Sequence, residues 1–143
     1  MYAKKRITLP YAKPTQKERL LRIFCVDFVR KMCPGVTIIG SMNDVWLGPG
    51  IKKYGYIETL KKLGCLVADE PDLMLRWAKG NTLYIELKCK GETPRKGQEE
   101  RLISLNESGF AAEWVDSADD FLTILKLHHV PIRSGAIYLD KQT

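Results

Sequence analysis

The sequence lacks the features that would assign it to several large classes of protein. It has no run of about 18 apolar residues, so no transmembrane helix is expected, and no signal-peptide pattern follows Met1. It has no internal repeat, no low-complexity segment and no glycine-rich loop of the kind that cradles nucleotide phosphates. We therefore expect no membrane partner and no nucleotide cofactor.

Cysteine and histidine are too few and too scattered to predict a zinc site. The four cysteines, at positions 25, 33, 65 and 89, form no C-x-x-C pair, and the two histidines are adjacent. Structural zinc sites need paired ligands at short, regular spacings. We expect the cysteines to be buried and reduced, as is usual for a cytosolic protein.

The length of 143 residues is that of one domain, and the charge is moderately basic. Lys and Arg outnumber Asp and Glu by 23 to 17, which gives a net charge of +6. A basic balance suits a polyanionic partner, although many basic proteins bind none. Basic side chains over residues 1–13, interrupted by Pro10 and followed by Pro14, predict an N-terminal arm, and a single domain is expected over residues 14–143.

The stretch from Pro71 to Lys88 predicts a β-hairpin that gathers charge at one end. Apolar or alternating runs flank the turn-forming residues 78–81. Because strand side chains alternate between faces, Glu86 and Lys88 share one face. A turn centred near Lys79 and Gly80 places Asp72 opposite Glu86 or within a residue or two of it. Two neighbouring carboxylates repel each other unless they share a proton or a cation. Mg²⁺ suits such a site because it prefers hard oxygen ligands. An exposed hairpin with solvated Glu and Lys is the alternative interpretation.

With the residues that follow, this hairpin resembles the PD-(D/E)xK nucleases and, within them, the VRR-NUC (virus-type replication–repair nuclease) family. In that family a PD dipeptide, an ExK strand and a glutamine on the next helix form the active centre. The matching residues, within roughly residues 50–125, are Pro71-Asp72, Glu86-Leu87-Lys88, Gly91, Gln98 and Gly109. The family usually has a glycine just before its PD, where this chain has Ala68-Asp69-Glu70.

The resemblance implies an α/β, restriction-endonuclease-like fold with an αβββαβ core, in which helices flank a mixed central sheet. It implies that Asp72, Glu86 and the backbone carbonyl of Leu87 hold Mg²⁺, for which Mn²⁺ substitutes. Lys88 would stabilise the attacking hydroxide or the transition state. Gln98 would orient a water or a phosphate oxygen through its amide.

Glu18 is a further candidate for the active centre, because these nucleases often add a glutamate from their first helix. Apolar residues at helical spacing predict that helix from Thr15 to about Met32. Thr15-x-x-Glu18 is also a capping box, in which the glutamate only ties down the start of the helix. Both roles for Glu18 stay open at this point.

Single-domain members of the family resemble the archaeal-type Holliday-junction resolvases, which implies a homodimer acting on branched DNA. Symmetric cutting of a four-way junction needs two active centres at a fixed distance. The predicted function is therefore a Mg²⁺-dependent, structure-selective DNA endonuclease. A flap-cutting or restriction-type nuclease is one alternative, and a non-catalytic DNA-binding module of the same fold is another. A compact single-domain copy suits a phage, so we expect the cytoplasm of a bacterial or phage-infected cell.

Periodicity and helix-ending residues predict the remaining elements. We expect a short buried strand over residues 36–40, helices over 51–63 and 94–108, and a strand over 110–115. A last helix, capped by Ser117, runs to about Leu127. In the helix over residues 94–108, three apolar residues are expected to face the sheet: Leu102, Ile103 and Leu105. Basic side chains add positive charge near the start of the same helix: Arg95, Lys96 and Arg101.

Overall fold

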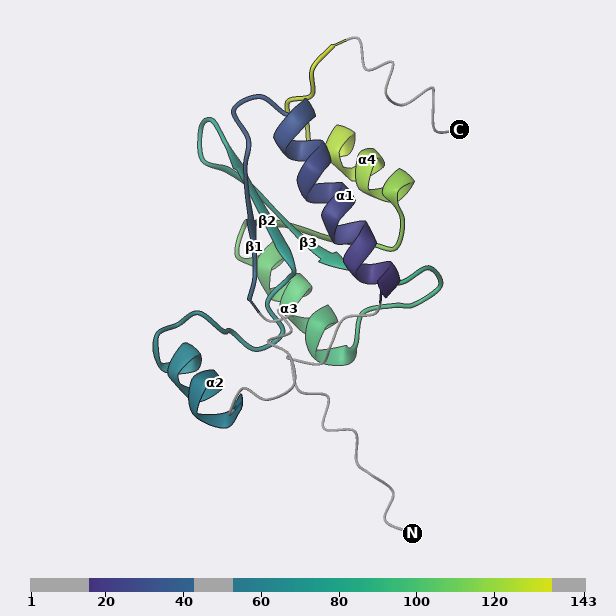
Figure 1. Cartoon of the computed structure of the whole chain (residues 1–143). Coiled ribbons are helices and arrows are strands. Elements are labelled where there is room, and N and C mark those ends of the chain that lie inside the picture. The colour runs from purple at the N-terminus through teal and green to yellow at the C-terminus, as the bar shows by residue number, and fades with distance from the viewer. Residues whose placement is uncertain (1–15, 43–52, 135–143) are drawn as a thin grey trace.

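The computed structural model describes residues 16–42 and 53–134, which form a four-stranded sheet with helices on both faces (Figure 1). The elements follow in the order α1 (Gln16–Met32), β1 (Thr37–Gly40), α2 (Lys53–Lys62), β2 (Leu73–Trp77), β3 (Asn81–Leu87), α3 (Lys96–Glu107), β4 (Ala111–Val115) and α4 (Ala118–Leu127). The expected order of helices and strands is confirmed. The expected basic arm and the expected capping residue Thr15 lie outside the described residues.

The sheet is mixed, with the strand order β1-β2-β3-β4. Strands β1, β2 and β3 form an antiparallel meander, and β4 pairs with β3 in parallel. A parallel neighbour needs a crossover connection, and α3 provides it between β3 and β4. The predicted hairpin is present, with Trp77 paired to Asn81 across the turn. The predicted mixed α/β sheet is therefore confirmed.

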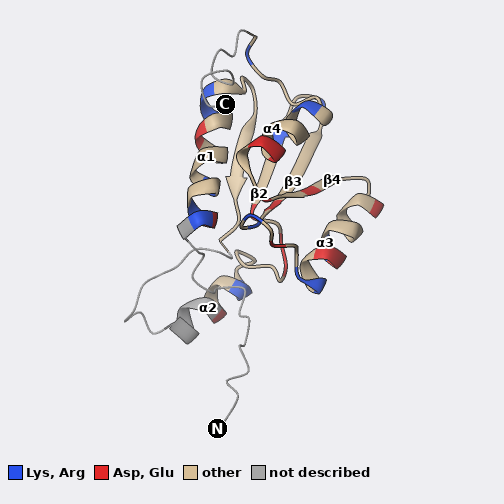
Figure 2. Ribbon diagram, turned by 90° about the vertical axis from the view of Figure 1, so that its right-hand side faces the viewer, with Lys and Arg blue, Asp and Glu red and all other residues tan. Residues whose placement is uncertain are grey.

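The helices form one layer on each side of the sheet. Helices α1 and α4 lie side by side on one face, and α3 covers the other face over β3 and β4 (Figure 1 and Figure 2). Helix α2 lies beyond one end of the sheet, apart from both layers, in the same two views. Within the described residues, no helix combines the length and the apolar content needed to cross a membrane.

The main hydrophobic core lies between the sheet and the pair of helices α1 and α4. Alternate residues of β3 point into it, because strand side chains alternate between faces: Leu83, Ile85 and Leu87. Phe121 of α4 is fully buried there, with its ring centroid 6.5 Å from that of Phe24 and 6.4 Å from that of Phe28. Both pairs are edge-to-face, so the three rings join α4 to α1.

A second, smaller apolar cluster lies under α3 on the opposite face. Leu102 and Leu105 of α3 pack there with Ala112 of β4 and Tyr84 of β3. The prediction that Ile103 also faces the sheet is wrong, because its side chain is 50% exposed. Each residue turns the helix by about 100°, so the residue next to Leu102 points well away from the sheet.

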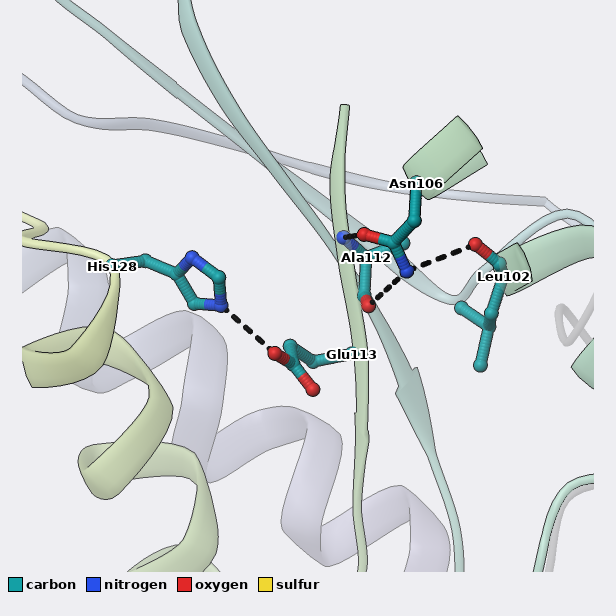
Figure 3. Close-up of polar contacts among 5 residues, drawn as sticks. All are labelled: Leu102, Asn106, Ala112, Glu113 and His128. Atoms are coloured by element: carbon teal, nitrogen blue, oxygen red, sulfur yellow. Dashed lines mark hydrogen bonds and ion pairs between the residues drawn. The ribbon is translucent and has the colours of Figure 1, made fainter. Parts of the chain in front are cut away.

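The two edges of the sheet differ in how they are covered. The prediction that the strand over residues 36–40 is buried is wrong, because β1 is an edge strand with mostly exposed residues. A short apolar run does not distinguish an edge strand from a central one. At the other edge, the Asn106 side chain binds the outward backbone groups of Ala112: Oδ1 accepts from its N–H and Nδ2 donates to its carbonyl, both at 3.0 Å (Figure 3). These groups of β4 are thereby closed to pairing with a further strand.

The four cysteines are all free thiols, but they are not all buried. Cys25 and Cys33 are buried, and burial raises the pKa of both thiols, that of Cys33 to about 11. Cys89 is half-buried and Cys65 is exposed. The expectation of burial is therefore wrong for Cys65, which follows the end of α2.

Candidate active site

The charged residues of the hairpin come together at the end opposite its turn. Leu73 pairs with Ile85, so the preceding Asp72 lies beside Glu86 on the neighbouring strand. Asp72 is 3% exposed, Glu86 is 2% exposed and Lys88 is 8% exposed. Charged side chains are rarely buried to this extent unless they are paired, since an unpaired buried charge is costly. The alternative of a solvated Glu and Lys on an exposed hairpin is therefore wrong.

Asp72 is held by backbone groups of two other segments. Its Oδ2 accepts a hydrogen bond from the N–H of Leu87 at 2.7 Å, and its carbonyl oxygen accepts one from the N–H of Ser41 at 2.8 Å. Its other carboxylate oxygen, Oδ1, receives no hydrogen bond from the residues that the structure describes. One oxygen of this buried carboxylate thus remains available to a ligand.

Glu86 is held by one amide and one ammonium group. Its Oε1 accepts a hydrogen bond from Gln98 Nε2 at 2.6 Å and lies 3.4 Å from Lys88 Nζ. The other end of the Gln98 amide, Oε1, accepts from the N–H of Arg95 at 3.0 Å. Because both ends of the amide are engaged, only one orientation of Gln98 satisfies its neighbours, and its donor faces Glu86.

Gln98 reaches Glu86 because of how α3 begins. The helix starts at Lys96, two positions after its expected start at residue 94, and Arg95 is its N-cap residue. Gln98 is then in the first turn, where backbone N–H groups have no partner within the helix. It satisfies one of them and is itself only 8% exposed. The family resemblance predicted Gln98 as a site residue, but it did not predict that Gln98 would donate a hydrogen bond to Glu86.

Among the residues that the structure describes, the buried charges of this site do not balance. With both carboxylates ionised, Asp72 and Glu86 outnumber the one ammonium group of Lys88. Adjacent carboxylates in a desolvated place favour uptake of a proton or a cation. A cation that prefers hard oxygen ligands would therefore fit this donor set.

Helix α1 brings Glu18 to the segment just after Lys88. The carboxylate of Glu18, the thiol of Cys89 and the carboxylate of Glu92 each offer a ligand atom, and these atoms lie within 4.8 Å of one another. The start of α1 therefore lies beside the end of the hairpin. Cys89 and Glu92 were not predicted to lie near Glu18, because a loop without periodicity gives no such signal. The capping-box alternative for Glu18 depends on Thr15, which lies outside the described residues.

The basic residues at the start of α3 are partly neutralised. Arg101 donates from Nε and Nη2 to Glu70 Oε2, at 3.1 and 2.9 Å. Lys96 Nζ lies 3.8 Å from an oxygen of Glu100. Figure 2 shows basic residues at the start of α3 and acidic residues farther along it. The expected positive charge of Arg101 at this end of α3 is therefore offset by Glu70.

The loop after Lys88 is anchored to the segment between β4 and α4. Asp116 accepts a hydrogen bond from the N–H of Gly91 at 3.2 Å, which lowers the pKa of its carboxyl group, and Lys90 Nζ lies 3.7 Å away. Ser117 Oγ accepts from the N–H of Asp120 at 3.1 Å, so the predicted cap of α4 is confirmed.

The fold is that of a solved structure described as a "VRR_NUC domain protein". The two align with a TM-score of 0.53 and 19% sequence identity, over 82% of this chain and 93% of the other. No protein-family model and no curated protein matches the sequence. At this identity the likeness shows a shared fold. It is the fold that the sequence resemblance implied, so the restriction-endonuclease-like α/β class is confirmed.

Proposed function

We propose that this protein is a nuclease that uses a divalent metal ion to hydrolyse phosphodiester bonds in DNA. The observation that supports this most strongly is the burial of Asp72 and Glu86 side by side with Lys88. A group of buried charges is a poor way to stabilise a fold, because apolar side chains of similar size do so at least as well. A role in chemistry explains the retained charges, and the shared fold with a VRR_NUC domain protein supports the same interpretation.

We propose Mg²⁺ as the metal ion, with Mn²⁺ as a substitute. Asp72 and Glu86 provide carboxylate oxygens, and a cation would balance the excess negative charge. The N–H of Leu87 points toward Asp72. The N–H and C=O of one strand residue face the same neighbouring strand, so the Leu87 carbonyl also faces the side of β3 on which Asp72 lies. These three groups are the proposed ligands.

Each remaining residue of the proposed site has a role of its own. Asp72 and Glu86 would hold a Mg²⁺ ion that, when bound, would make a water molecule more acidic and offset charge on the phosphate. Lys88, whose Nζ lies 3.4 Å from Glu86, donates to oxygens on which negative charge develops in the transition state. Gln98 keeps the Glu86 carboxylate in one orientation. Glu18 supplies a further carboxylate from α1 beside the residue that follows Lys88.

Replacement of Lys88 by Met should lower kcat about 100- to 1,000-fold, the range found when one donor to a developing negative charge is removed. Met keeps most of the side-chain volume. Lys88 is not a proposed ligand, so the Mn²⁺ concentration for half-saturation should not rise. Single-turnover cleavage and a calorimetric Mn²⁺ titration measure the two quantities separately. Unchanged cleavage by Lys88→Met would contradict the role given to this residue.

We propose branched DNA as the substrate, cut by a homodimer. Paired cuts in a four-way junction require two centres related by symmetry, and one chain of this size carries one proposed centre. The proposal expects an isologous dimer with both centres on one basic face. A monomer at micromolar concentration would contradict junction resolution and would leave flap-cutting or restriction-type cleavage as the better proposal.

Cleavage of end-labelled DNA tests the proposed function. Four-way junctions, flaps, single strands and linear duplexes are incubated side by side with Mg²⁺, with Mn²⁺ and with a chelator. Symmetric nicks in the junction, lost with the chelator, are the expected result. Cleavage of flaps or linear duplex alone would favour the alternative nucleases. Binding of DNA without any cleavage would favour a non-catalytic module of the same fold.

A further inference from the structure

One turn of α3 contacts both segments that carry the buried carboxylates. Gln98 holds Glu86 of β3, as described above. Gly97 and Arg101, at the two ends of the same turn, lie against the residues that precede Asp72. The same short piece of helix therefore touches both sides of the candidate site.

The contact with Arg101 is a charge-assisted hydrogen-bonded pair. Its Nε and Nη2 both donate to Glu70 Oε2, at 3.1 and 2.9 Å. The side chains of Arg101 and Glu70 are only 35% and 21% exposed, so solvent screens the pair less than it screens a surface pair. Charge-assisted bonds of this kind fix geometry as well as adding free energy. Glu70 is thus tied to α3 at a point two residues before Asp72.

The contact with Gly97 is a close approach of Asp69. A Cβ atom at residue 97 would lie 2.5 Å from Asp69 Oδ2 and 2.9 Å from its Cγ, so the Asp69 carboxylate occupies the space that a side chain there would need. Asp69 adopts left-handed backbone at φ 56°, which Asp tolerates better than most residues. The segment that leads into Asp72 is therefore fitted to the first turn of α3.

The link from Glu70 to Asp72 is short and stiff. Only Pro71 separates them, and the proline ring locks its own φ near −65°. Pro71 is itself buried, so it cannot swing freely into solvent. A displacement of Glu70 is consequently passed on to Asp72, whose Oδ2 is fixed to Leu87. The resemblance to the nuclease family did not predict this arrangement. The family usually has a glycine just before its PD, and this chain has Glu70 at that position.

We propose that Glu70 and Arg101 are positioning residues that hold the Asp72 carboxylate at the separation from Glu86 at which both bind one cation. This inference rests on the proposed function. Gln98 holds the Glu86 carboxylate, and the Glu70–Arg101 pair holds the segment that leads into Asp72, so α3 contributes to the spacing between the two carboxylates. Outer contacts of this kind change metal affinity by about 10- to 100-fold in metalloproteins.

Calorimetric titration of the purified protein with Mn²⁺, in the absence of DNA, tests the proposal. The variants are Glu70→Gln, Arg101→Met and the two combined. Each single variant should raise the Mn²⁺ Kd about tenfold or more. The double variant should raise it no further, because both changes break the same contact. Arg101→Lys keeps the charge but loses the planar fork, so its Kd should fall between those of the wild type and Arg101→Met.

Glu113→Gln is the matched control. Glu113 Oε1 lies 2.9 Å from His128 Nε2, and the two side chains are 36% and 24% exposed, similar to the Glu70–Arg101 pair (Figure 3). This contact joins β4 to the end of α4 and includes none of the candidate site residues. Thermal melts without metal show how much each variant loses in stability alone. Glu113→Gln should lower the melting temperature without changing the Mn²⁺ Kd.

The possible results of these titrations and melts distinguish failure of the positioning role from failure of the proposed function. A wild-type Kd in Glu70→Gln and in folded Arg101→Met, with lower melting temperatures, would overturn the positioning role and leave a structural pair. Unchanged Mn²⁺ binding with weaker DNA binding in Arg101→Met would overturn it in favour of a phosphate contact. A wild-type protein that binds no Mn²⁺ would overturn the proposed function, and this inference with it.

Discussion

The Glu86→Gln variant should lose about 10³- to 10⁴-fold in the rate of DNA cleavage, equivalent to about 4 to 5.5 kcal/mol of transition-state stabilisation. The substitution preserves the shape of the side chain but removes its charge. A neutral amide is a weak ligand for Mg²⁺, which prefers carboxylate oxygens. The fold should persist, because the amide oxygen of the new residue accepts the hydrogen bond that Gln98 Nε2 now donates to Glu86 at 2.6 Å.

Single-turnover cleavage of the preferred DNA substrate measures this loss. Glu99→Gln is the matched control, since Glu99 undergoes the same chemical change on the exposed side of α3, next to Gln98 in sequence. Its activity should stay close to that of the wild type. Cleavage by Glu86→Gln within about tenfold of the wild type, a change of only about 1.4 kcal/mol, would remove Glu86 from the proposed site.

The Phe121→Ala variant should lose about 3 to 5 kcal/mol of unfolding free energy. Phe121 is 0% exposed, and its ring contacts Phe24 and Phe28 edge-to-face. Truncation removes buried apolar surface and leaves a cavity between α1 and α4 that a close-packed core fills only in part. Since a typical domain is stable by about 5 to 15 kcal/mol, this one substitution should bring the protein close to its stability limit.

Urea denaturation followed by circular dichroism measures this change. Leu127→Ala is the control on the same helix, because Leu127 is 64% exposed and its truncation should alter the unfolding free energy by less than about 0.5 kcal/mol. Equal losses from the two substitutions would contradict the assignment of Phe121 to the main core.

Local sequence signals were enough to predict much of the fold. The hairpin could be predicted because residues 78–81 form a turn between two runs of strand-like residues, and its register then brought Asp72 beside Glu86. The cap at Ser117 could be predicted because its partner, Asp120, is three residues away. Signals of this kind depend on neighbours in sequence, so one chain suffices to detect them.

Contacts between distant segments could not be predicted in this way. Glu70 and Arg101 are 31 positions apart, and nothing in the sequence pairs them. The same holds for the partner of Gln98, which depends on how α3 packs across β3 and β4. The exposure of β1 depends on its position at the edge of the sheet, and the composition of the strand does not distinguish an edge position from a central one.

The melting temperature with and without Mn²⁺, for the wild type and for Asp72→Ala, tests the central claim most directly. Binding to the folded state alone adds about 2.7 kcal/mol at a Mn²⁺ concentration 100 times the Kd. The wild type should therefore melt at a distinctly higher temperature with Mn²⁺, while Asp72→Ala, which lacks one proposed ligand, should show little or no rise. An equal rise in both proteins, or none in the wild type, would contradict a metal centre built on Asp72 and Glu86.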